Sequence, residues 1–161
     1  MKKLITLSLC LAAALLLTGC GSQESGELAN PFVEYDTIEE AEKAAGFDLS
    51  VPESIDGLSE RIIRVDSEDQ LIEVIYQNGQ DEDQEIRIRK AVGTDEISGD
   101  YNDYSQSRTL DVDGIAVTVK GDDDLITVAT WARDPYVYSL GNYTDSKFTE
   151  EKTAALVKEI K

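Results

Sequence analysis

Residues 108–119 read RTLDVDGIAVTV and give the strongest local prediction of structure in the chain. Apolar and polar residues alternate on both sides of Asp113-Gly114, a dipeptide that favours the two-residue turn of a β-hairpin because it tolerates a positive φ at both turn positions. The segment therefore predicts two antiparallel strands, 108–112 and 115–119, joined by this turn.

More strands are expected before and after the hairpin. Runs that are β-branched or that alternate in polarity occur at 60–65, 71–76, 85–92, 125–132 and 136–140. The letters NG and then the acidic QDEDQ mark the turn between the second and third of these runs, and a DP dipeptide marks the turn before the last. About seven strands that follow one another in this way predict an antiparallel meander.

A helix is predicted at each end of the strand region. The first, TIEEAEKAAG (37–46), begins with a capping box in which Thr37 and Glu40 bond each other's backbone, and it ends at a glycine. The second, TEEKTAALVKEIK (149–161), has Thr149 as its cap, acids in its first turn and lysine in its last. Together these elements predict an α+β fold, with both helices on one face of a twisted antiparallel sheet.

Alternation along the strands also assigns side chains to faces. Tyr136 and Tyr138 share one face and are expected in the core under the C-terminal helix, although with Trp131 they could instead line a ligand cavity. Arg87 and Arg89 alternate with isoleucines and are expected on the solvated face.

The first 19 residues have the three parts of a secretory signal peptide. Two lysines follow the initial Met, residues 4–17 are apolar, and small residues precede Cys20. The apolar part is shorter than the roughly 20 residues of a spanning helix. The letters LTGC (17–20) resemble the bacterial lipobox, in which the Cys thiol receives a diacylglyceryl group and cleavage leaves this Cys as the first residue. The plainer alternative is an ordinary signal peptide that ends near a Cys.

These features divide the chain into a signal peptide (1–19), a lipidated Cys20 with a flexible polar tether (20–30) and a single α+β extracytoplasmic domain (31–161). The expected location is the cell membrane, where two acyl chains hold the protein durably on the extracytoplasmic side. Because Cys10 lies in the signal peptide and Cys20 carries the lipid, no disulfide is expected in the domain.

Without the signal peptide the chain is strongly acidic. Two of the 15 Lys and Arg residues and none of the 33 Asp and Glu residues lie in 1–19, which leaves 13 against 33 and a net charge of −20. Such a surface disfavours nucleic acid and does not bind an anionic membrane by charge, so the lipid must supply the membrane attachment. We expect the domain to be monomeric.

The residue types also argue against catalysis. The chain has no His and the mature domain has no free thiol, so the common nucleophile–base pairs and His-based metal sites cannot form. No nucleophile elbow or phosphate loop occurs. The acidic runs QDEDQE, GDDDL and DVDG lack the spacing of a calcium-wrapping loop and are interpreted as solvated hairpin tips. We expect no enzyme activity, no catalytic residue, no cofactor and no metal site.

Four segments resemble, in order, an uncharacterised extracytoplasmic domain family of Gram-positive bacteria: NPFVEYDTIEEAEKAAGFDLSVP (30–52), ISGDYNDY (97–104), GIAVTVKG (114–121) and TWARDPYVYSL (130–140). Members of this family are mostly small lipoproteins and the outer portions of anti-sigma factors, and some accompany domains that resemble lipoprotein carriers. The resemblance covers nearly all of residues 30–161 and implies location and architecture. Because no cytoplasmic helical portion is present, a direct anti-sigma role is not expected.

Two classes of function fit these observations. The first is a non-catalytic binding or interaction module, regulatory or not, that contacts a protein or another cell-envelope partner. The alternative is a carrier or chaperone that holds a lipid or other apolar ligand between sheet and helices. A carrier needs an apolar cavity of roughly several hundred Å³, whereas a binding module needs only an exposed patch.

The segment GTDEISGDYNDYSQ (93–106) is the candidate partner contact. It is too polar for a core strand, its glycines interrupt any helix, and long loops of this kind are often functional. Tyr101 and Tyr104 lie among Asp100 and Asp103, and tyrosine side chains are enriched at interfaces, while the acids favour a basic partner. The alternative is that one or both tyrosines pack back against the domain and the loop is a spacer.

The lipid anchor generates the first prediction. Cys20→Ser removes the thiol that accepts the lipid, so the variant should stay unprocessed or leave the membrane, because no other durable attachment is expected. Detergent partitioning of the two forms measures this. A variant that is still processed and fully membrane-bound would contradict the lipoprotein assignment.

Overall fold

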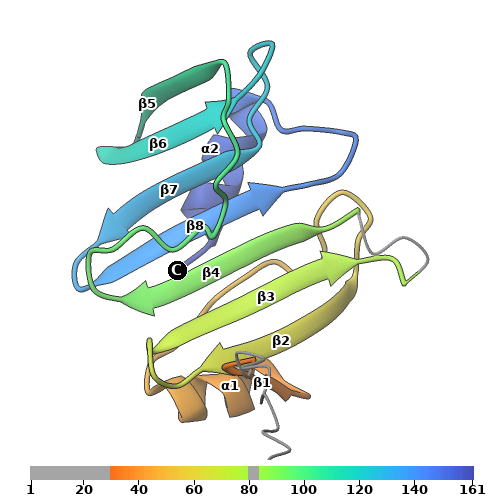
Figure 1. Ribbon diagram of the computed structural model, residues 1–161, viewed down its shortest axis with the longest axis vertical. Coiled ribbons are helices and arrows are strands. Elements are labelled where there is room, and N and C mark those ends of the chain that lie inside the picture. Colours follow the sequence, from red (N-terminus) through yellow and green to blue (C-terminus); the bar gives the residue numbers. More distant parts are fainter. Residues whose placement is uncertain (1–29, 80–83) are drawn as a thin grey trace, which may run out of the picture. The chain divides into compact units, whose positions relative to one another are not determined.

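Eight strands form one antiparallel sheet in the order β1-β2-β3-β4-β8-β7-β6-β5 in a computed structural model (Figure 1). The structure describes residues 30–79 and 84–161. The strands are β1 (Phe32–Tyr35), β2 (Glu60–Asp66), β3 (Leu71–Gln77), β4 (Ile86–Val92), β5 (Gln106–Val112), β6 (Ile115–Gly121), β7 (Val128–Arg133) and β8 (Tyr136–Asn142), and the helices are α1 (Ile38–Ala45) and α2 (Glu150–Glu159). The predicted α+β fold, an antiparallel sheet with one helix near each end of the domain, is confirmed.

The predicted meander is present as two meanders joined edge to edge. Strands β1–β4 follow one another, the chain then crosses to the far edge at β5, and it returns strand by strand to β8, which pairs with β4 (Figure 1). The crossing segment is the long loop 93–105, which the sequence analysis singled out as non-regular. Strand β1 was not predicted.

The local signals in the sequence produce the turns and caps that they predicted. Asp113 and Gly114 have φ values of 54° and 86°, and they join β5 to β6 in the expected register. Thr37 accepts a hydrogen bond from the amide of Glu40 at 3.2 Å, and Thr149 caps α2 in the same way.

Both helices pack on the same face of the sheet, as predicted. The main core unites small and aliphatic residues of the two helices with the inward side chains of the strands, including Ala41, Ala45, Val65, Val74, Ile88, Leu140, Leu156 and Val157. Tyr138 is buried in this core and stacks on Trp131, with ring centroids 5.3 Å apart. The prediction that these aromatic residues belong to the core is confirmed for Tyr138 and Trp131, whereas Tyr136 is partly buried and packs against the core.

Two cationic side chains of the sheet donate hydrogen bonds to backbone carbonyls of the layer that contains the helices. Arg133 on β7 donates to the carbonyls of Val157 and Ile160 at 2.6 Å each, which satisfies the C-terminal end of α2. Lys90 on β4 donates to the Asp48 carbonyl at 2.5 Å, and its ammonium group lies 4.3 Å from the centre of the Tyr136 ring. Burial lowers the pKa of Lys90.

Several predicted features lie outside the described residues, namely the signal peptide, Cys20, the tether up to residue 29 and part of the acidic turn at 80–83. Within the described ranges, 30–79 and 84–161, no helix is long and apolar enough to cross a membrane.

Candidate functional site: the outer face of the sheet

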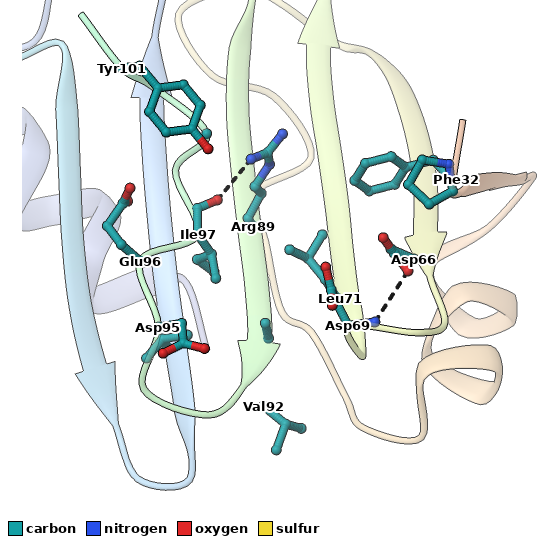
Figure 2. A pocket seen from close by; sticks show the side chains of 14 residues that line it. Phe32, Asp66, Asp69, Leu71, Arg89, Val92, Asp95, Glu96, Ile97 and Tyr101 are labelled. Carbon is teal, nitrogen blue, oxygen red and sulfur yellow. Dashed lines mark hydrogen bonds between the residues drawn. The ribbon is translucent and has the colours of Figure 1, made fainter. Parts of the chain in front are cut away.

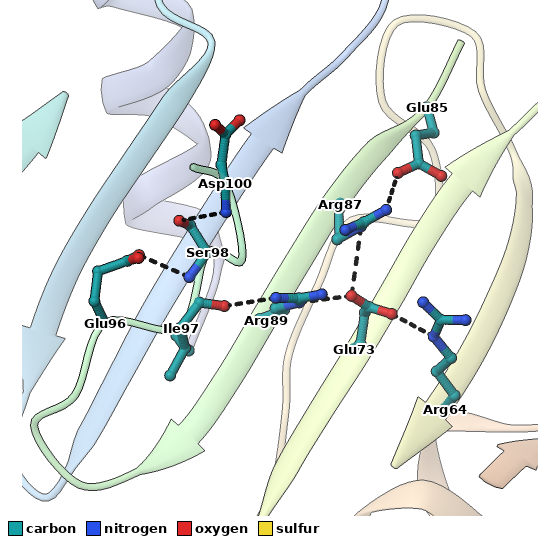
Figure 3. A network of polar contacts seen from close by, with 9 residues as sticks. All are labelled: Arg64, Glu73, Glu85, Arg87, Arg89, Glu96, Ile97, Ser98 and Asp100. Atoms are coloured by element: carbon teal, nitrogen blue, oxygen red, sulfur yellow. Dashed lines mark hydrogen bonds and ion pairs between the residues drawn. The ribbon is translucent and has the colours of Figure 1, made fainter. Parts of the chain in front are cut away.

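The sheet face that points away from the helices, called the outer face below, has a buried carboxylate at its centre. Glu73 on β3 is 0% exposed, and its carboxylate contacts Arg64 on β2 and both Arg87 and Arg89 on β4 (Figure 3). The Nε atoms of Arg89 and Arg87 lie 2.6 and 3.4 Å from Oε2, and Nε of Arg64 bonds Oε1. These four residues are called the Glu73 cluster. A buried charge requires such compensation, because desolvating it alone is costly.

The strand register brings this cluster together. Glu73 lies directly opposite Arg64 in one neighbouring strand and directly opposite Arg89 in the other. Cross-strand neighbours of opposite charge are the favourable arrangement on a sheet surface. Arg87 and Arg89 lie on the face that the alternation predicted, but the expectation that this face is solvated there is wrong. Their side chains are only 24% and 12% exposed, because Arg87 pairs with Glu85 and Glu73, and Arg89 bonds Glu73 and the overlying loop.

The Glu73 cluster also holds the loop 93–105. Arg89 uses Nε for Glu73 and Nη1 for the carbonyl of Ile97, at 2.8 Å, so that it joins the sheet to the loop (Figure 3). A hydrogen bond within the loop also stabilises its conformation, because the amide of Ser98 donates to the Glu96 carboxylate at 2.7 Å. A charged side chain that bonds a loop carbonyl stabilises it more than a neutral one would.

Asp100 organises the second half of the loop. Its side chain accepts hydrogen bonds from the amide of Asn102 and from the hydroxyl of Tyr104, both at 2.8 Å. Burial acts to raise the pKa of Asp100, but these hydrogen bonds and one from Tyr143 outweigh it and hold the pKa below its usual value. Burial and the Asp100 carboxylate raise the pKa of Tyr104 to about 12.

The four predicted partner-contact residues therefore have different environments. Asp100 is buried and Tyr104 is half-buried, and they bond each other within the loop. Tyr101 is 94% exposed and Asp103 is also exposed. The alternative in which tyrosines pack against the domain fits Tyr104 and does not fit Tyr101. Contact with a partner stays a prediction, and Tyr101 and Asp103 are the two that can make it directly.

A groove of about 380 Å³ runs beside the first half of the loop (Figure 2). Its base belongs to a second, smaller apolar cluster on the outer face, made of Leu71, Ala91 and Val137 with Phe32 and Ile97 against them. Four large apolar side chains are exposed among the described residues, and two of these, Val92 and Tyr101, line this groove. The groove therefore includes exposed apolar side chains, a feature that interaction sites share.

The groove has acidic walls. Asp66 and Asp69 line it at the turn between β2 and β3, and Asp95 and Glu96 line it from the loop, with Leu71 between the two pairs (Figure 2). Among the described residues of the lining, Arg89 is the single cation, and its guanidinium is bonded to Glu73 and Ile97. The groove therefore offers apolar contact surrounded by negative charge.

In the described part of the chain, no group of three or more Asp, Glu, His or Cys side chains is placed to hold a metal ion. The acids of the groove stand on two separate walls.

Comparisons of the chain with protein-family models, with curated proteins and with solved structures give no match. The resemblance to the extracytoplasmic domain family therefore stays a prediction.

The role of Asp100 can be tested by its dependence on pH. Asp100→Asn removes a charge that receives several hydrogen bonds, so the free energy of unfolding at pH 7 should fall by about 1–3 kcal/mol. Because the folded-state pKa is depressed, this stabilisation exists above the usual Asp pKa and disappears as pH falls through the folded value. Urea unfolding at pH 7 and pH 3 should show a larger loss at pH 7 than at pH 3.

Asp103→Asn is the matched control, since Asp103 lies in the same loop and is exposed. It should leave the free energy of unfolding within about 0.5 kcal/mol of the wild-type value. Equal effects of the two substitutions at pH 7, or an Asp100→Asn loss that is as large at pH 3, would refute the assigned role.

Proposed function

We propose that this chain is a membrane-anchored extracytoplasmic lipoprotein whose domain acts as a non-catalytic binding module, with the groove on the outer face as its binding surface. The observation that carries the proposal is the groove on the outer face, which has exposed apolar side chains above an apolar base. Leu71, Ala91 and Val137 form the buried base, and the exposed residues Val92 and Tyr101 line the groove. Apolar surface left open in this way is favoured where a partner covers it.

The architecture gives this surface a rigid support. The base of the groove lies on adjacent sheet strands, and one wall is a loop fastened by Arg89 to the carbonyl of Ile97. Binding sites on rigid elements lose little conformational entropy when the partner docks. Tyr101 fits this role because an exposed tyrosine presents a flat apolar ring and a hydroxyl with few rotatable bonds.

No observation favours the alternative of an apolar-ligand carrier. The alternative places the ligand between sheet and helices, where side chains of both helices and the strands are packed with exposures of 0–5%, for example Ala41, Val74, Leu156 and Val157. A carrier of this design needs an enclosed apolar cavity in that layer. The groove lies on the opposite face and has acidic walls.

The proposed anchor would hold the groove close to the membrane. Pro31 and Phe32, the first residues of the folded unit, line the groove, and Cys20 lies eleven positions before Pro31 in the sequence. At about 3.6 Å per residue, a fully extended connection spans at most about 40 Å. We therefore expect the partner to be a component at or near the membrane surface.

Site-specific photo-cross-linking in intact cells tests this proposal. A photo-reactive phenylalanine analogue at Tyr101 should give a discrete adduct, because this position stands at the groove and is 94% exposed. The same analogue at Glu151, an exposed position of α2 on the helical side, is the control and should not give that adduct. Adducts of equal yield at both positions, or none at Tyr101, would contradict the outer face as the binding surface.

A further inference from the structure

From the charges around the groove we infer that its occupant is a cationic, partly apolar polypeptide segment, one that carries Lys or Arg side chains between apolar residues. This inference rests on the proposed function and names the chemistry of the partner. Four carboxylates line the groove, and the single guanidinium among the lining residues is engaged elsewhere. An apolar occupant without positive charge would leave these carboxylates uncompensated.

The arrangement of the acids favours a segment over a compact cation. Asp66 and Asp69 stand on one wall, Asp95 and Glu96 stand on the other, and the apolar side chain of Leu71 lies between them (Figure 2). The described residues hold no cluster of side chains fit for a metal ion. A chain with several Lys or Arg residues can place cations at both walls and an apolar residue over Leu71. The aliphatic stems of these side chains also suit an apolar floor.

The rim acids are available to such a partner. Asp69 and Asp95 are exposed and have no side-chain bond among the contacts of the described residues, and Glu96 spends one carboxylate oxygen on the amide of Ser98. Asp66 is buried and uses Oδ1 for the amides of Glu68 and Asp69, so it contributes fixed negative charge from below. Asp69, Asp95 and Glu96 are called the rim acids.

The whole protein is strongly acidic and therefore attracts cations to any part of its surface. Binding at the groove must have a further cause if it is to be specific. In the groove, acidic side chains lie beside apolar ones. Tyr101 and Val92 are its exposed apolar residues, and Leu71, Ala91 and Val137 form its buried apolar base. Specific docking must therefore depend on the rim acids far more than on acids elsewhere.

The experiment uses the lipidated protein in nanodiscs of zwitterionic phosphatidylcholine, with empty nanodiscs as the blank. Three labelled peptides repeat the unit Leu-X-Ala, with X as Lys, Gln or Glu, and a photo-reactive leucine in each allows the contact to be mapped by mass spectrometry. Fluorescence anisotropy gives the Kd at physiological salt. The Lys peptide should bind and should cross-link to the segments around Leu71, Ala91 and Ile97, whereas the Gln and Glu peptides should not.

Two triple variants of equal charge separate specific docking from diffuse attraction. Asp69→Asn, Asp95→Asn and Glu96→Gln together remove the rim acids and should weaken the Lys peptide roughly tenfold. Asp123→Asn, Asp124→Asn and Glu53→Gln make the same change in net charge at exposed positions outside the groove lining, and they should alter the Kd by less than about twofold because of screening.

Each other result overturns the inference. Equal weakening by both triple variants would mean diffuse attraction to an acidic protein, and absence of groove cross-links with the Lys peptide at millimolar concentration would mean no cationic site. Groove binding by the Gln or Glu peptide that equals binding of the Lys peptide would reject a cationic occupant, while the groove as a binding surface would stand. Failure of the Tyr101 cross-linking in cells would reject the proposed function itself.

Discussion

The buried carboxylate of Glu73 is the constraint on which the outer face depends. It lies within a strand between two others, and it is tolerated there because Arg64, Arg87 and Arg89 converge on it. One of these arginines also reaches the carbonyl of Ile97, so that the charge in the sheet determines where the long loop can lie. Removing one partner from such a cluster is expected to cost about 3–5 kcal/mol, much more than a surface ion pair contributes.

The two faces of the sheet therefore differ in what covers them. The helical side is closed by two helices and by aliphatic side chains, and it supplies the stability that a domain without a disulfide needs. The outer side has a smaller apolar cluster beside the loop 93–105. The groove above this cluster is open and has carboxylates on both walls. In a chain of net charge −18, positive side chains are scarce, and three arginines are used on the outer face to hold one glutamate.

The features that the sequence predicted are those that depend on neighbours in the chain. The hairpin turn at Asp113-Gly114 and the caps at Thr37 and Thr149 follow from local backbone chemistry, so pattern alone is sufficient for them. The pairing of β4 with β8 and the groove depend on segments far apart in sequence, and alternation carries no information on which strands meet.

The sequence does contain one signal for the site. Glu73 is a charged residue inside the apolar run LIEVIY, and a charge at such a position requires a partner on a neighbouring strand. Likewise, the sequence could not predict which of Tyr101 and Tyr104 is exposed. Only the fold shows that the hydroxyl of Tyr104 donates to Asp100.

Hydrogen exchange in a Glu73→Gln variant tests most directly whether the buried charge holds the loop that walls the groove. The amides of Ser98 and Asp100 report on the loop, and those of Gly114 and Leu125 report on turns elsewhere that have their own hydrogen bonds. The account predicts that exchange at Ser98 and Asp100 becomes roughly tenfold faster, a local loss of about 1.4 kcal/mol, while Gly114 and Leu125 change by less than about twofold. Unchanged exchange in the loop, or an equal rise at all four amides, would contradict it.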